Sequence, residues 1–248
     1  MGTPELHIEG GVARITLRRP EQANRLEPDD LVVLADHIAA INARPEVLVL
    51  VLQSEGRYFC SGYDISKIGS SRNVEFDEVI NLLEDCRPVT VAVLQGSVYG
   101  GATDMALACD FRIGAQGIDM FMPAARLGLH FYPRGLERYV SRLGVDQAKR
   151  LFLTAERIDA DEMKAIGFLT QLAPAQSLAE AAEALIATLS GMAPLPLIGM
   201  KKHLNRIARG TLDAADLQND MARAGASADL REGQAAWAEK RKPRFTGR

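Results

Sequence analysis

Residues 96–110 (GSVYGGATDMALACD) constrain the fold of this chain more than any other segment. They follow a largely apolar run, residues 89–94, and pass through two adjacent glycines into an apolar helical pattern. The first N–H groups of a helix have no intrahelical acceptor, and the helix dipole adds partial positive charge there. Because glycines let a ligand approach those donors closely, we expect an anion-binding site at Gly100 and Gly101.

Asp104 is the acidic residue nearest to these donors in the sequence. It follows Gly101 by three residues, which places its carboxylate on the same face of the predicted helix. An oxyanion stabiliser and an acid/base group would therefore converge on one small site. The alternative is structural, since the dipole favours an Asp in the first turn of any helix.

Length and charge limit the classes of protein to be considered. The 248 residues, of which 47% are hydrophobic, suffice for one large domain or a core with a small appendage. A net charge of -3 with scattered Lys and Arg argues against nucleic acid as the main partner. The basic cluster at 240–248 is either a solvated tail or a phosphate contact. No segment approaches the roughly 20 apolar residues of a membrane span, so we expect no membrane partner.

The cysteines indicate a reducing compartment. Cys60, Cys86 and Cys109 lack metal-ligand spacing, and an odd count fits poorly with a disulfide framework. We expect no metal and, because the N-terminal residues do not resemble a secretory leader, a cytoplasmic location.

The order of the predicted elements indicates an α/β fold. A hairpin is expected over 6–9 and 12–17, strands over 47–52, 89–94, 111–113 and 119–121, and helices over 28–43 and 74–85. Buried strands, glycine-bearing loops and helices thus alternate, and in such folds ligands bind at the carboxyl ends of strands. The rest is almost all helical, with one short strand expected within 167–172; the helices are expected over 136–143, 145–155, 159–166, 178–189, 196–208, 212–226 and 227–240.

The loop at 122–135 carries turn-forming residues together with side chains able to line a pocket. The candidates are Arg126, His130, Phe131 and Tyr132. His130 is the only histidine of the chain in a predicted pocket loop, and a structural or solvated role is its alternative.

Three motifs resemble the crotonase (enoyl-CoA hydratase/isomerase) superfamily. FCSGYDI at 59–65 and GSVYGGATDMALACDF at 96–111 look like its two oxyanion-hole motifs, and DLREGQAAWAEKRKPRFTGR at 229–248 is similar to its closing segment. The resemblance implies a spiral of ββα units, residues 1–190, and a C-terminal helical trimerisation region, residues 191–248. It also implies an acyl-CoA thioester as substrate, with coenzyme A present only as part of that substrate, and a homotrimer or homohexamer.

The resemblance assigns roles to particular residues. The N–H groups of Tyr63 and Gly101 would hold the thioester oxygen. The remaining contacts to coenzyme A would come from Leu26, Ser61, Gly62, Asp64, Ile65 and Gly100, with Lys242 and Phe245 reaching it from the same or a neighbouring subunit.

Two positions depart from the family pattern. The hydratases of the family use two glutamates, where this chain has Asp104 and, after Pro123, Ala124. Ala124 cannot move a proton, so Asp104 is the acid/base residue that remains at these two positions. We therefore expect isomerase- or hydratase-like proton transfer at the α-carbon with Asp104 as base. Glu137, two residues after Gly135, is an alternative source of the second acid.

Two other functions stay open at this point. One is decarboxylation of a malonyl-type acyl-CoA, which needs mainly the oxyanion hole. The family's decarboxylases have His and Tyr where this chain has Tyr63 and Phe131, so Tyr132 or Arg126 would hold the substrate carboxylate. The other is a catalytically silent binder of CoA thioesters or an RNA-binding relative, which the acidic balance disfavours.

Overall fold

The computed structural model describes residues 2–67 and 74–248, and within them two sheets organise the chain. The larger sheet has six strands in the order β1-β2-β3-β5-β7-β10; these are β1 (Glu5–Glu9), β2 (Val12–Leu17), β3 (Val49–Ser54), β5 (Val89–Leu94), β7 (Phe111–Ala115) and β10 (Gln171–Ala173). The smaller sheet has the order β4-β6-β8-β9; these are β4 (Tyr58–Cys60), β6 (Ser97–Tyr99), β8 (Asp119–Phe121) and β9 (Ile158–Asp159). Only the β1–β2 and β8–β9 pairs are antiparallel.

The chain passes from one sheet to the other in a repeated ββα unit. In each turn a strand of the large sheet leads to a strand of the small sheet and then to a helix: β3, β4 and α2 (Phe76–Asp85), then β5, β6 and α3 (Gly101–Ala108), then β7, β8 and α4 (Pro133–Leu143). The predicted α/β class and the predicted spiral are confirmed. β3 and β5 are buried on both faces over most of their length, as their largely apolar sequences indicate.

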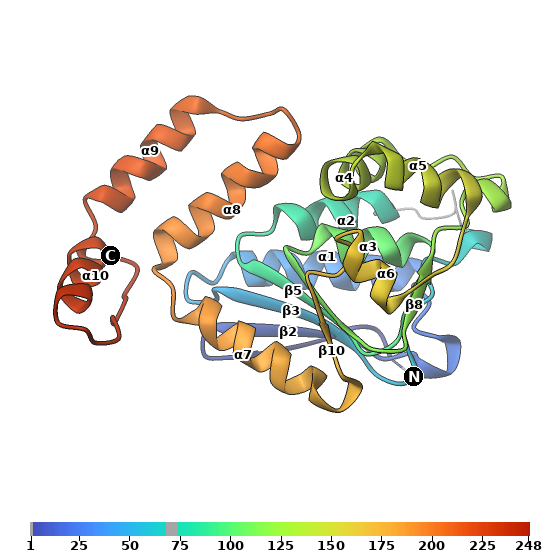
Figure 1. Ribbon diagram of the computed structural model, residues 1–248, viewed down its shortest axis with the longest axis horizontal. Coiled ribbons are helices and arrows are strands. Elements are labelled where there is room, and N and C mark those ends of the chain that lie inside the picture. The colour runs from blue at the N-terminus through green and yellow to red at the C-terminus, as the bar shows by residue number, and fades with distance from the viewer. Residues whose placement is uncertain (1, 68–73) are drawn as a thin grey trace.

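Helices cover both faces of the large sheet (Figure 1). On one face lies α7 (Leu178–Ser190), and on the other lie α1 (Pro28–Asn42), α2 and α3. A capping box at Glu27 and Asp30 and a proline in the first turn fix the start of α1. The remaining helices are α5 (Val145–Thr154), α6 (Ala160–Ala165), α8 (Pro194–Ala208), α9 (Ala214–Gly225) and α10 (Ala228–Ala238).

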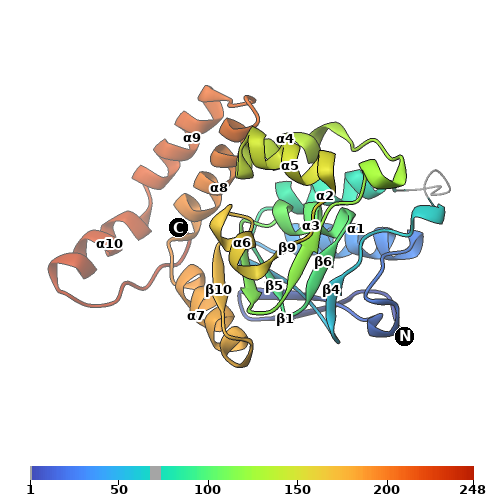
Figure 2. The same cartoon turned by 45° about the vertical axis from the view of Figure 1, so that its right-hand side comes forward.

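The C-terminal helices α8, α9 and α10 lie to one side of the two sheets (Figures 1 and 2). Several of their large apolar side chains are exposed. On α8 these are Met200, Leu204 and Ile207, which recur at a spacing of four and three residues and so share one face, and Trp237 of α10 is 88% exposed. Single exposed apolar residues are ordinary, whereas these three lie together on one face of α8.

Sequence patterns found the large sheet but missed most of the small one. β4, β6 and β9 have two or three residues each, too short to show a period. β6 inserts between β5 and α3, so the segment at 96–110 contains its own strand rather than a direct turn from the strand before it.

The three thiols are free and buried. Burial raises the pKa of both Cys60 and Cys109 to about 12. Among the described residues no single helix has the length and apolarity of a membrane span, and the bent pair Ala175–Ser190 and Pro194–Ala208 meets those criteria only when the two helices are taken together.

Candidate active site

A cavity of about 400 Å³ lies where the two predicted motifs meet. Its wall comes from the segment after β4, the start of α2, the β6–α3 junction and the loop between β8 and α4. Ten of the predicted site residues line it: Ser61, Gly62, Tyr63, Ile65, Gly100, Gly101, Ala124, His130, Phe131 and Tyr132. The topology therefore brings both glycine-bearing segments and the predicted pocket loop to one place.

Two backbone N–H groups border this cavity without a partner. A parallel bridge with Leu26 fixes the segment after β4: Leu26 N donates to Gly62 O at 2.8 Å, and Asp64 N donates to Leu26 O at 3.0 Å. Neither the N–H of Tyr63 nor that of Gly101 has an acceptor in the part of the chain that the structure describes. Both donors are therefore available to a ligand in the cavity.

Helix α3 begins without a side-chain cap, and its N-cap residue, Gly100, has φ +56. Few residues other than glycine adopt this conformation readily. The ring of Phe76 covers the next residue, since a Cβ on Gly101 would lie 2.7 Å from the Phe76 Cζ. The unpartnered N–H group of Gly101 at the start of the helix thus lies beside an aromatic ring.

Asp104 lies behind the cavity wall and does not line it. Its carboxylate is fully buried, and the Tyr132 hydroxyl donates to its Oδ2 at 2.5 Å. Burial raises the pKa of Asp104, and the neighbouring Arg138 guanidinium and Tyr132 hydroxyl oppose that rise. Tyr132 does line the cavity, so Asp104 reaches a ligand only through this phenol. The sequence analysis expected Asp104 at the site itself and Tyr132 in the pocket loop; the structure places Tyr132 on the wall and Asp104 behind it, a relationship that no sequence pattern indicated.

Burial also controls Tyr132. Loss of solvent, together with the charge of Asp104, raises its pKa well above the usual value, so the phenol is protonated at neutral pH. Its ring stacks on Phe131 with centroids 4.3 Å apart. The two aromatic residues therefore hold the hydroxyl in a fixed direction, toward Asp104.

A second carboxylate joins Asp104 on the same arginine. Arg138 Nε donates to Asp104 Oδ1 at 3.0 Å and its Nη2 donates to Oδ2 at 3.1 Å. From the other side, Arg138 Nη1 donates to Glu84 Oε2 at 2.8 Å. No sequence pattern indicated Arg138 or Glu84, because they come from α4 and α2 and only the fold brings them together.

Several other predicted residues lie outside the cavity wall. Arg126 Nη2 donates to the backbone oxygens of Ala155 at 3.2 Å and Thr154 at 3.5 Å. Asp64 Oδ1 accepts from the backbone N–H of Ser66 at 3.0 Å and from its hydroxyl at 2.7 Å, which fixes the loop. Leu26 is buried and contributes its backbone to that loop. Lys242, Phe245 and Glu137 also do not line the cavity of their own chain.

The cavity contains residues that the sequence patterns did not suggest. Phe76, Leu127 and Leu129 make it largely apolar, while Glu75 and Asp77 place carboxylates on its wall. Among the lining residues that the structure describes there is no Lys or Arg. A helix start is a common place for acidic residues, so Glu75 and Asp77 carried no sequence signal of their own.

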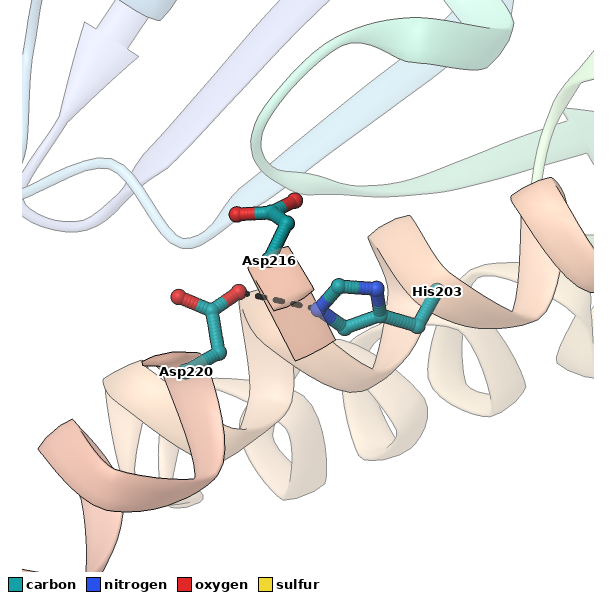
Figure 3. Close-up of side chains that lie close together, drawn as sticks. All are labelled: His203, Asp216 and Asp220. Carbon is teal, nitrogen blue, oxygen red and sulfur yellow. Dashed lines mark hydrogen bonds and ion pairs between the residues drawn. The ribbon is translucent and has the colours of Figure 1, made fainter. Parts of the chain in front are cut away.

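A separate cluster joins α8 to α9. His203, Asp216 and Asp220 bring their ligand-type atoms within 4.8 Å of one another, and His203 Nε2 lies 3.0 Å from Asp220 Oδ2 (Figure 3). However, Lys202 Nζ lies 2.8 Å from Asp216 and 2.6 Å from Asp220, and Arg206 also pairs with Asp216. These cations already match the two carboxylates, so we interpret the cluster as an ion-pair junction between the helices.

The fold is that of known crotonase-type enzymes. An enoyl-CoA hydratase of Bacillus anthracis superposes with a TM-score of 0.86 over 100% of both chains, at 26% identity. The chain is 31% identical to a probable enoyl-CoA hydratase of Mycobacterium bovis, covering 97% of this chain and 91% of that protein. It is 30% identical to an enoyl-CoA isomerase/hydratase of Mycosarcoma maydis, covering 96% and 93%.

The family model of enoyl-CoA hydratase/isomerase matches residues 7–248. The chain belongs to this family and is an enzyme of the hydratase/isomerase type. The resemblance found in the three sequence motifs is thereby confirmed over almost the whole chain.

Proposed function

We propose that this acyl-CoA-processing enzyme moves a proton at the α-carbon of a thioester whose carbonyl oxygen accepts hydrogen bonds from the Tyr63 and Gly101 N–H groups. The observation that carries the proposal is the pair of unpartnered donors on a cavity that Tyr132, the hydrogen-bond partner of Asp104, also lines. An enolate places negative charge on that oxygen. Fixed donors stabilise the charge without reorganising, and each contributes about 3 kcal/mol.

Tyr132 and Asp104 supply the proton transfer as a pair. As Asp104 takes the phenol proton, the phenol oxygen takes the α-proton, which leaves a protonated Asp104, a neutral Tyr132 and the enolate. Reversal of these steps at the γ-carbon completes a 1,3 shift with no net change in the enzyme. Burial suits Asp104 to this role because its raised pKa lets it hold the proton.

Of the two proton-transfer reactions, the geometry favours isomerisation over hydration. Addition of water needs a group that orients the water, and the position after Pro123 presents only the methyl group of Ala124 to the cavity. The neighbouring wall, Leu127 and Leu129, is apolar as well. A single proton-transferring pair is sufficient for the 1,3 shift.

No observation favours the decarboxylation of a malonyl-type acyl-CoA. Such a substrate carries a carboxylate on the acyl group, and the described wall of the cavity holds Glu75 and Asp77 but no Lys or Arg. Arg126, the candidate for holding that carboxylate, is bonded to backbone oxygens outside the wall. Like charges without a matching cation would repel the substrate, so we expect a neutral acyl group.

The test is an assay of wild type and Tyr132→Phe against enoyl-, 3-hydroxyacyl- and malonyl-type CoA esters, in which chromatography separates the double-bond isomers before mass spectrometry because isomers have the same mass. We expect turnover of an enoyl ester and a loss of about 10²-fold or more in kcat for Tyr132→Phe, with KM nearly unchanged. Tyr58→Phe is the matched control, since Tyr58 lies outside the cavity wall. Full activity of Tyr132→Phe would exclude this mechanism, and failure to bind any CoA thioester would exclude the substrate class.

We also propose that α8–α10 join copies of the chain into a trimer or hexamer in the cytoplasm. The exposed residues Met200, Leu204 and Ile207 on α8 supply an apolar surface on which a second copy can pack. Residues 191–248 would then form the oligomerisation region of the chain. Lys242 and Phe245 would then reach coenzyme A in a neighbouring subunit. Light scattering should give at least three times the chain mass for wild type and a smaller mass for Leu204→Glu. A monomeric wild type would contradict the proposal.

A further inference from the structure

Arg138 connects the reacting pair to a buried network of charge. Its side chain is fully buried between two carboxylates, Asp104 on α3 and Glu84 on α2, and it contacts both directly. A guanidinium in that place is costly unless both sides are matched. Removing either carboxylate therefore changes how the other is held.

Glu84 is the centre of this network. Besides Arg138, it contacts Arg134, Arg142 at 3.3 Å and Arg209 at 3.2 Å. Burial alone would raise the pKa of Glu84, but the charge and hydrogen bonds of Arg138, with those of the other arginines, lower it to about 2. Glu84 is therefore ionised throughout the working range of an enzyme.

The elements that meet at Glu84 explain why it can act at a distance. Arg134, Arg138 and Arg142 stand four residues apart on α4, so they share one helix face. Arg209 follows α8 and comes from the C-terminal helices. One buried carboxylate thus ties α4 and the end of α8 to α2.

We infer that Glu84 and Arg138 are positioning residues of the reaction: Glu84 holds Arg138, and Arg138 holds the Asp104 carboxylate in the orientation in which it accepts the Tyr132 proton. The inference rests on the proposed function. The groups that face Asp104 are Tyr132 and Arg138 in direct contact, with Glu84 behind Arg138 and Tyr139 close by on α4. Arg209 acts on this site through Glu84.

Removal of the Glu84 charge should shift the pH dependence of the reaction in a defined direction. Glu84 raises the pKa of Asp104 because it is a neighbouring negative charge. In Glu84→Gln this charge is gone while Arg138 remains, so the acidic limb of the kcat–pH profile should move to lower pH, and kcat should fall. Arg209→Gln leaves Glu84 less neutralised, so its acidic limb should move the other way.

Asp85→Asn is the matched control. Asp85 shares Arg134 and Arg209 with Glu84, and no contact with Arg138 is found among the described residues. It should keep the wild-type acidic limb. Arg138→Lys keeps the positive charge but loses the pair of hydrogen bonds to Asp104. The acidic limb of its kcat–pH profile should therefore stay near that of wild type while kcat falls.

The outcomes separate the network from a purely structural role. Circular dichroism and the Kd of a CoA thioester first establish that each variant is folded and binds. Opposite limb shifts for Glu84→Gln and Arg209→Gln support the inference; a lower kcat with unmoved limbs in both overturns it. If Glu84→Gln does not fold, a limb shift in Arg209→Gln alone decides. Full activity of Tyr132→Phe overturns the proposed function instead.

Discussion

Gly62 and Gly101 approach each other so closely that a Cβ on Gly62 would lie 3.1 Å from the Gly101 nitrogen and 3.0 Å from the Tyr99 carbonyl oxygen. Gly62 also has φ +95, a conformation that disfavours any side chain. These two residues bring the segment after β4 and the start of α3 together. The spacing of the two unpartnered N–H groups depends on that contact.

Gly62→Ala should therefore lower kcat/KM by about 10²-fold, the cost of misplacing one oxyanion donor. The methyl group would push Gly101 N away from Tyr63 N, and kcat should fall more than KM rises. Steady-state kinetics on an enoyl-CoA ester measures both. Gly117→Ala is the control, because Gly117 has φ +85 but no atom within 4 Å of the added Cβ. Equal losses in both variants would show that backbone strain alone is responsible.

The sequence predicted the parts of the site that depend on local chemistry. Adjacent glycines at a helix start indicated the free N–H groups at Gly101, and the resemblance in the first motif indicated Tyr63. It could not predict Arg138 and Glu84, because a buried pair leaves no period or motif and exists only when α2, α3 and α4 meet. Most of the small sheet was not predicted for a related reason. Strands of two or three residues are stabilised by neighbouring strands and are too short to show a sequence pattern of their own.

Ala124→Glu should give the enzyme hydratase activity. Ala124 lines the cavity, and a carboxylate there would supply the group that orients water, a contribution of about 10²-fold or more. The gain is measured as the rate of hydration of an enoyl-CoA, monitored by the loss of absorbance of the conjugated thioester. Ala125→Glu is the control, since the neighbouring Ala125 is exposed and does not line the cavity. No gain over wild type would contradict our view of what this cavity lacks.

Asp104→Asn should destabilise the fold as well as slow the reaction. The amide still accepts a hydrogen bond from Tyr132, but Arg138 loses one of its two carboxylates in a site without solvent. Breaking a buried ion pair costs about 3–5 kcal/mol of the free energy of unfolding. Urea denaturation measures this loss. Glu156→Gln removes an exposed pair with Arg150 and should leave the free energy of unfolding nearly unchanged. Equal stability of Asp104→Asn and wild type would show that the pair is not holding the helices.

Glu84 should also set the stability of the fold in acid. Its pKa is about 2 in the folded chain and ordinarily 4.5, so the unfolded chain binds a proton first as the pH falls. The stabilisation from this group is complete above about pH 4.5 and is lost as the pH falls toward 2, by about 3 kcal/mol in all. Denaturation of wild type and Glu84→Gln at a series of pH values isolates this contribution, because the other carboxylates are common to both proteins. The difference between the two free energies of unfolding should shrink through this range; a constant difference would show that Glu84 titrates normally in the folded state.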